Sequence, residues 1–262
     1  MNEVLVVDRA PAGVVTLTLN RPEAHNALSP ELTDALEQQV EAIGRESTLR
    51  ALVLTGAGPS FCAGGDIKAM RAMVAGTRAE RMARSTRVAR LLAAIRALPV
   101  PVLARVNGPA FAGGAGLVSV ADIAIAVEGA RFGFTEPRIG IAPANISPYV
   151  LARVGASAGR RLFLTAQRFE AAEGLRLGLY DRVVAADALD AAVGAELEAI
   201  LQCSPTALAA CKRLIAEVPG KDGKTAMEYT ATVLADLWET DDAREGIAAF
   251  NEKRKPRWAR DA

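Results

Sequence analysis

Phe61-Cys-Ala-Gly-Gly-Asp-Ile-Lys68 and Asn107-Gly-Pro-Ala-Phe-Ala-Gly-Gly-Ala-Gly-Leu117 are two glycine segments around which the rest of the chain can be interpreted. Each follows an apolar run typical of a strand, at residues 51–55 and 102–106, and each opens into a helical pattern. Small residues at such turns let backbone N–H groups come close to a ligand. Two N–H groups that converge on one oxygen can stabilise an oxyanion, a large term in acyl chemistry. The pair of segments therefore predicts an enzyme.

The composition indicates a globular protein without a strong electrostatic partner. The chain has 262 residues, of which 51% are hydrophobic and only 5% aromatic, so a large core would consist mainly of Ala, Val, Leu and Ile. The formal net charge is +1. Such a balance argues against nucleic acid or an anionic membrane as the partner, but leaves room for a local basic pocket that binds a small anion.

The three cysteines, Cys62, Cys203 and Cys211, are too few for a disulfide framework in a chain of this length. Their spacing fits no metal site, and the chain has a single histidine. The N-terminus lacks the basic and apolar regions of a signal peptide, and no apolar run approaches a membrane span. We expect a cytoplasmic protein with reduced thiols, and with no metal or separate cofactor.

Alternating strand, turn and helix patterns over the first two-thirds of the chain predict an α/β fold. Residues 4–8 and 14–19 form β-rich runs around a Gly-containing turn, which predicts a hairpin. Ser29-Pro30 then predicts a helix start, with Ser as the N-cap and Pro at the first helical position.

The chain changes character in its last quarter, where three helical patterns follow one another at 205–218, 225–238 and 242–253. We therefore divide the chain into a core at 1–200 and a helical region at 201–262. This region has too few apolar residues to be a stable domain alone, so it should pack on the core or on another subunit.

Taken together, the motifs resemble the enoyl-CoA hydratase/isomerase (crotonase) superfamily over nearly the whole chain. Their order and spacing carry the resemblance, since a glycine pair alone is weak evidence. The matching stretches are Leu19–Leu28, Val53–Gly56, Phe61–Lys68, Val106–Gly114, Ala121–Ile123, Phe132–Pro137, Gly178–Val183 and Asp241–Phe250.

The resemblance implies a spiral of β-β-α turns, a C-terminal helical region that builds homotrimers or dimers of trimers, and acyl-CoA thioester substrates. It also implies an oxyanion hole made by the N–H groups of Gly65 and Gly113. The helix that begins at Gly113 adds partial positive charge where an enolate forms. By the same resemblance, the residues that bind substrate or CoA are Ala24, Ala63, Gly65, Asp66, Ile67, Lys68 and Gly113.

The chain departs from the family at one catalytic position. Two-carboxylate hydratases of the family carry one glutamate where this chain has Gly116, whereas the second glutamate is present as Glu136. Three interpretations remain open: Glu136 activates water and returns the same proton to carbon, Glu136 shuttles a proton between two carbons, or another acid such as Asp122 or Glu128 replaces the missing one. Gly116 itself would then make room for a bulkier acyl group.

The segment Ile139–Tyr149 favours hydration over isomerisation. It resembles the Pro-Ala-x-Ile-Ser-Pro-Tyr segment of bacterial members assigned to branched glutaconyl-CoA hydration in leucine or isoprenoid breakdown. Isomerisation, another crotonase reaction or a non-catalytic scaffold remain alternatives. The acyl chain depends on the shape of the loop at 70–76 and on the surroundings of Tyr149, which the sequence does not fix; nor does it fix trimer against hexamer.

Overall fold

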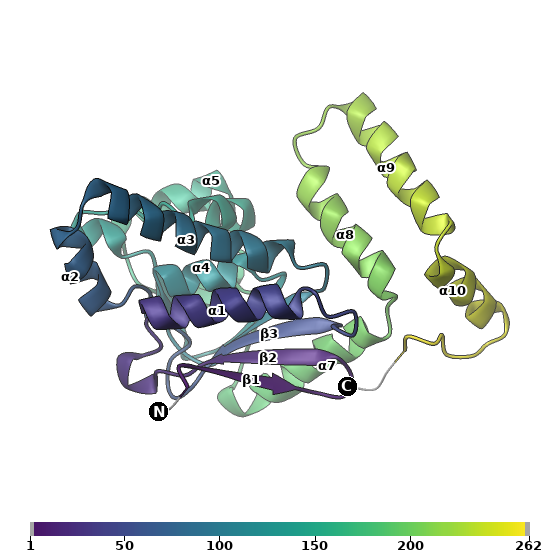
Figure 1. The fold of residues 1–262 in the computed structure, drawn as a ribbon, viewed down its shortest axis with the longest axis horizontal. Helices are drawn as coiled ribbons and strands as arrows, with labels where there is room; N and C mark the ends of the chain where they lie inside the picture. The colour runs from purple at the N-terminus through teal and green to yellow at the C-terminus, as the bar shows by residue number, and fades with distance from the viewer. Residues whose placement is uncertain (1–2, 260–262) are drawn as a thin grey trace.

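The computed structural model describes residues 3–259 (Figure 1). In the described part of the chain, one sheet has the strand order β1-β2-β3-β4-β6-β9. Its strands are β1 (Leu5–Arg9), β2 (Val14–Leu19), β3 (Ala51–Gly56), β4 (Val102–Val106), β6 (Ile123–Val127) and β9 (Arg182–Val184). The first pair is an antiparallel hairpin, as predicted, and the remaining pairs are parallel.

The middle of this sheet forms the core, because its strands are covered on both faces. All six residues of β3 are buried, as expected of a parallel strand between two layers. The helices are α1 (Pro30–Ile43), α2 (Ile67–Ala75), α3 (Arg78–Ala97), α4 (Gly113–Val120), α5 (Ser147–Thr165), α6 (Ala171–Arg176), α7 (Leu189–Leu201), α8 (Pro205–Glu217), α9 (Gly223–Trp238) and α10 (Asp241–Asn251). In Figure 1, α1 and α3 lie above the strands and α7 lies below them.

A smaller sheet, ordered β5-β7-β8, positions the site. Its strands are β5 (Ala110–Phe111), β7 (Arg131–Gly133) and β8 (Phe169–Glu170). Strands β5 and β7 are parallel, with Phe111 opposite Gly133, and the Ala112 N–H extends the pairing by donating to the Gly133 carbonyl at 2.8 Å. The backbone therefore leaves both strands at the same edge of this sheet. Strand β5 leads into α4, and β7 leads into the 3-10 helix η2 (Glu136–Ile139).

Helices α8, α9 and α10 extend away from the sheets (Figure 1). Their attachment uses a few polar contacts. The Lys212 Nζ on α8 donates to the Val100 carbonyl at 2.8 Å and to the Asp122 Oδ2 at 2.6 Å. The buried Arg50 guanidinium donates to the carbonyl oxygens of Cys203 and Trp258, both at 2.8 Å. The predicted division after residue 200 falls at the end of α7 and stays a prediction.

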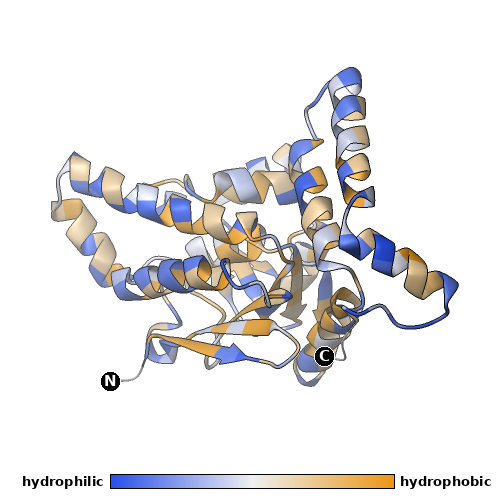
Figure 2. Cartoon of the chain, turned by 45° about the vertical axis from the view of Figure 1, so that its right-hand side comes forward, coloured by the Kyte–Doolittle hydropathy of each residue, from blue (hydrophilic) through white to orange (hydrophobic). Residues whose placement is uncertain are grey.

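Large apolar side chains remain exposed along this C-terminal region. Figure 2 shows hydrophobic residues distributed among hydrophilic ones on these helices. The exposed set on α8 to α10 is Ile215, Met227, Leu234, Trp238, Ile247 and Phe250, with Phe250 82% exposed. Chains seldom leave such a set open to water without a partner surface.

One local prediction is wrong. The segment at 70–76, expected as a loop, belongs to α2 up to Ala75. The Asp66 side chain caps this helix by accepting the Ala69 N–H at 3.0 Å, which favours helix directly after the first glycine segment. Two predicted helix starts are confirmed, since Ser29 and Ser204 are N-caps before Pro30 and Pro205. In the described residues, no helix has the length and apolar character of a membrane span.

Candidate active site

The first glycine segment lies between two neighbouring stretches of backbone. On one side, the Ala63 N–H donates to the His25 carbonyl at 2.9 Å, and the Leu28 N–H donates to the Gly64 carbonyl at 2.7 Å. On the other side, the Phe111 N–H donates to the Cys62 carbonyl at 2.9 Å. The segment is therefore held by backbone hydrogen bonds from both directions.

The two predicted turns meet at backbone distance. A Cβ placed on Gly64 would lie 3.2 Å from the Gly113 nitrogen, and one placed on Gly113 would lie 3.8 Å from the Gly64 Cα. A Cβ on Gly114 would lie 2.1 Å from the Cys62 carbonyl oxygen. Glycine at 114 is therefore required for the helix α4 to begin beside the first turn.

The carbonyl partners fix the direction of the two predicted oxyanion donors. No described peptide bond is cis, and in a trans peptide the carbonyl and the following N–H point in opposite directions. The Gly64 carbonyl points to Leu28, so the Gly65 N–H points away from it. The Ala112 carbonyl accepts from the Gly116 N–H at 3.0 Å, so the Gly113 N–H points out of the start of α4. Neither N–H donates to another group in the described part of the chain.

The backbone of the residue before Gly113 is strained. Ala112, directly before Gly113, has φ of 49° and ψ of −120°, a conformation that costs a residue with a Cβ about 1–3 kcal/mol. The hydrogen bond from the Ala112 N–H to Gly133 holds it there. Such strain is typical of functional turns, where the surrounding structure imposes an otherwise unfavourable geometry.

Glu136 begins η2, at the same edge of the smaller sheet as the start of α4. Its side chain is half-buried, and its Oε2 is buried with no hydrogen-bond partner in the described structure. Burial raises the pKa of this carboxyl above its ordinary value of 4.5. A carboxylate that is partly desolvated and has a free oxygen is suited to proton transfer.

The position of the missing carboxylate is filled by another side chain. A Cβ on Gly116 would lie 2.2 Å from the Ile146 Cγ2 and 2.9 Å from the Ile146 Cβ. Ile146 is only 4% exposed and belongs to the core. The interpretation that Gly116 makes room for a bulkier acyl group is therefore wrong, because Ile146 takes that room.

The two candidate replacement acids lie elsewhere. The Asp122 carboxylate accepts from the Val102 N–H at 2.8 Å and pairs with Lys212 and with Arg96, so it is committed to joining α8 to the core. Glu128 is exposed in the turn after β6. Of the three carboxylates considered for proton transfer, Glu136 is the one that follows a strand paired with β5, the strand before Gly113.

The protein-family model described as enoyl-CoA hydratase/isomerase matches residues 9–261. The chain belongs to the enoyl-CoA hydratase/isomerase family. A Thermus thermophilus relative named "Putative enoyl-CoA hydratase" is 36% identical over 245 residues, covering 94% of this chain and 97% of the relative. The crystal structure of a Mycobacterium smegmatis enoyl-CoA hydratase has a TM-score of 0.92 at 36% identity, covering 97% of this chain and 98% of its own. Pseudomonas aeruginosa AtuE has a TM-score of 0.92 at 41% identity, covering 98% and 100%. The predicted crotonase-type α/β fold is confirmed.

The residues that the family resemblance assigned to CoA binding differ in their solvent exposure. Ala63, Gly65, Ile67 and Lys68 are exposed, while Ala24 at the end of the 3-10 helix η1 (Pro22–Ala24) and Gly113 are half-buried. Asp66 is buried, and the pKa of its carboxyl is lowered by the Ala69 N–H and by the Arg21 guanidinium, which lies 3.0 Å from Oδ2. Asp66 is therefore engaged inside the protein, as is Arg21.

Two residues that the sequence did not single out shape this family site. Asn26 is fully buried in a left-handed conformation, and its Nδ2 donates to the carbonyls of Ala57 and Ser60 at 2.9 and 2.8 Å. Ile146 fills the space beside Gly116. Asparagine in a polar loop is a weak signal for a left-handed residue, whereas the position of Ile146 depends on packing between α4 and α5, which no local pattern encodes.

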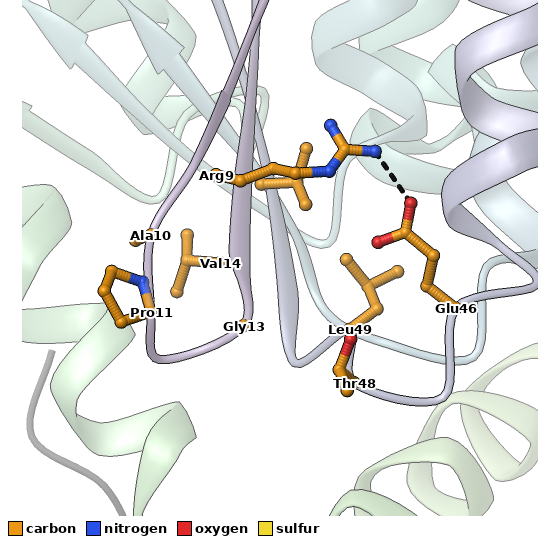
Figure 3. Close-up of a pocket in the computed structure, with 9 residues that line it drawn as sticks. Arg9, Ala10, Pro11, Gly13, Val14, Glu46, Thr48 and Leu49 are labelled. Carbon is orange, nitrogen blue, oxygen red and sulfur yellow. Dashed lines mark hydrogen bonds and ion pairs between the residues drawn. The ribbon is translucent and has the colours of Figure 1, made fainter.

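A cavity of about 290 Å³ lies at the β1–β2 turn (Figure 3). Its lining includes Arg9, Pro11, Val14 and Glu46, and the Arg9 Nη2 lies 2.7 Å from the Glu46 Oε1. None of its lining residues belongs to the glycine turns or to η2. The two charged residues of this lining, Arg9 and Glu46, are therefore paired with each other.

Proposed function

We propose that this protein is an enoyl-CoA hydratase that adds water across the 2,3 double bond of an enoyl-CoA thioester. The thioester oxygen accepts from the Gly65 and Gly113 N–H groups. The observation that carries the proposal is the unpartnered Oε2 of Glu136 at the edge where those two turns meet. Family membership supports the substrate class, an acyl-CoA thioester.

A single carboxylate serves both proton transfers in this reaction. Glu136 takes a proton from water while the water oxygen bonds to C3, and the π electrons move onto C2 and the thioester oxygen as an enolate. Glu136 then gives that proton to C2, which regenerates the thioester and the carboxylate. Its raised pKa favours this double role, because a group that must accept and then donate works best near the pH of the medium.

Isomerisation of a 3-enoyl-CoA is the second candidate. In this reaction Glu136 removes a proton from C2 and returns it to C4, with the same two N–H groups stabilising the enolate. The closed space at Gly116 favours this candidate, since one carboxylate suffices and no second acid fits there. The resemblance of 139–149 to branched glutaconyl-CoA hydratases favours hydration.

Oxygen-18 water separates the two reactions. Incubation of 2-enoyl-CoA and 3-enoyl-CoA esters, including branched glutaconyl esters, is followed by product mass, and only hydration places solvent oxygen on carbon. Glu136→Gln should lower kcat by at least about 10²-fold while thioester binding persists. Glu128→Gln is the matched control, because Glu128 is exposed in a turn away from the site. Full turnover in Glu136→Gln would remove this residue as the proton carrier.

We also propose that copies of the chain assemble as a homotrimer or a dimer of trimers through α8 to α10. The support is the row of exposed apolar side chains on these helices, and their limited attachment to the core. Sedimentation of the full chain tests the assembly, and a monomer at micromolar concentration would contradict it.

A further inference from the structure

Arg21 is connected to the Gly65 N–H through two peptide groups. Its Nη1 donates to the Ala27 carbonyl at 2.7 Å. The next N–H along the chain, that of Leu28, donates to the Gly64 carbonyl at 2.7 Å. The next N–H after that carbonyl is the Gly65 N–H. Because each peptide is trans, each carbonyl and its N–H point in opposite directions, and the bonds run in sequence.

The cation at the start of this chain of bonds is held in place. The Arg21 side chain is only 19% exposed. Its backbone N–H donates to the Asn26 Oδ1 at 2.9 Å and its carbonyl accepts from the Asn26 N–H at 2.8 Å. The same Nη1 lies 3.0 Å from Asp66 Oδ2, and the Asp66 Oδ1 accepts from the Ala69 N–H. Arg21 therefore ties the 21–28 loop to both sides of Gly65.

We propose that Arg21 is a positioning residue for the oxyanion site, and that it acts through the Ala27–Leu28 and Gly64–Gly65 peptides. This inference rests on the proposed function. A guanidinium donor polarises the carbonyl that it binds, and consecutive hydrogen bonds strengthen one another. This series of hydrogen bonds, from Arg21 to the Gly65 N–H, is called the relay below. It orients the Gly65 N–H and makes it a stronger donor to the thioester oxygen as negative charge develops there.

Two simpler roles predict different behaviour. If Arg21 bound a CoA phosphate, its loss would raise the dissociation constant of any CoA ester. If Arg21 only held the 21–28 loop in place, its loss would lower the melting temperature and the affinity for CoA esters together. The relay instead predicts a fall in kcat of about tenfold with KM changed by less than about twofold, because the stabilisation is greatest in the transition state.

The test measures the polarisation of the thioester carbonyl directly. An enoyl-CoA ester with carbon-13 at the carbonyl is bound to Glu136→Gln, which holds it unreacted, and the carbonyl stretch is read by infrared difference spectroscopy. Arg21→Met and Arg21→Lys are added to this background. Arg9→Met is the matched control, since Arg9 forms its ion pair at the β1–β2 turn.

In the Glu136→Gln parent we expect a carbonyl frequency below that of the free ester. Arg21→Met should move it back towards the free value, while Arg21→Lys and Arg9→Met retain most of the shift. A full shift in Arg21→Met overturns the relay, as does an equal loss in Arg9→Met, which would indicate a general effect of removing a guanidinium. No shift in the parent would instead count against the oxyanion site of the proposed function.

Discussion

At the scale of single residues, Glu136 shows how the fold can bury a carboxylate oxygen without giving it a hydrogen-bond donor. Its Oε2 has been removed from water without receiving a described hydrogen-bond partner. The sequence predicted the identity of this carboxylate from a family pattern. It did not predict the burial, because burial comes from η2 packing at the edge of the smaller sheet.

The raised pKa of Glu136 gives a pH dependence with a definite sign. Burial makes the pKa of Glu136 higher in the folded state than its ordinary value of 4.5, so the folded protein binds more protons than the unfolded chain at pH values between the two pKa values. The contribution of this group to the free energy of unfolding therefore falls as the pH rises through that range. We expect the acidic limb of kcat/KM to have its midpoint above pH 4.5, since the carboxylate form is the base.

We also expect Glu136→Gln to melt at a higher temperature than the parent at pH 8 but not at pH 4. A lower melting temperature at pH 8 would contradict the burial argument.

The Gly116–Ile146 contact gives a second residue-scale prediction. Gly116→Ala should destabilise the protein by about 1–3 kcal/mol by overpacking against Ile146. In an Ile146→Ala background the same change should be neutral or stabilising, because alanine favours helix by about 1 kcal/mol and the obstruction is gone. Urea unfolding of the four proteins in this cycle measures the coupling.

Gly194 on α7 is the matched control for this cycle. A Cβ at that position meets nothing within 4 Å, so Gly194→Ala should stabilise by about 0.4–1 kcal/mol. Equal effects of Gly116→Ala in both Ile146 backgrounds would show that the two side chains do not compete for the same space.

At the scale of elements, the turn between β5 and α4 shows how strain and hydrogen bonding are balanced. Ala112→Gly should leave the free energy of unfolding within about 1 kcal/mol of the parent, because relief of the positive φ offsets the greater chain entropy of glycine. Ala112→Val should be clearly destabilising, since a β-branched residue tolerates this region worst. Guanidinium unfolding distinguishes them, and a stable Val variant would show that the turn can relax.

The contact between α8 and the core can be tested through Lys212. Burial lowers the pKa of this ammonium, while Asp122 opposes that shift. Lys212→Met should cost about 1–3 kcal/mol, because it leaves the Asp122 carboxylate with fewer donors inside the structure. Lys224→Met on α9 is the control, since Lys224 is exposed in its pair with Glu228. Equal unfolding midpoints for the two variants would show that the Lys212 contact adds nothing.

Elements with a local signal could be predicted from the sequence, and those set by packing could not. The hairpin and the starts of α1 and α8 follow from turn and capping residues. The helix that opens from the first glycine segment was predicted, but its extent to Ala75 was not, because residues 70–76 were interpreted as a specificity loop. Convergence of the glycine turns followed from the family resemblance, whereas the occupation of the second carboxylate's place by Ile146 required the packing of α4 on α5.

At the scale of the whole molecule, the exposed face of the C-terminal helices predicts self-association. Phe250 on α10 is 82% exposed. Phe250→Asp should shift the sedimentation profile towards the monomer, because a charge buried at an interface without a partner is costly. Val74→Asp on α2 is the control, with a comparable exposure of 80% outside this region. Identical profiles for the two variants would place the interface elsewhere.

Arg50 secures both the entry to the C-terminal region, at Cys203, and its exit, at Trp258. One guanidinium therefore holds both ends of the C-terminal helical region, whose helices extend away from the sheet (Figure 1). Lys212 on α8 adds a second attachment to the core, through the Val100 carbonyl and the Asp122 carboxylate. Because Arg50 is buried in the core, the placement of both ends of the C-terminal helical region depends on the folding of the core.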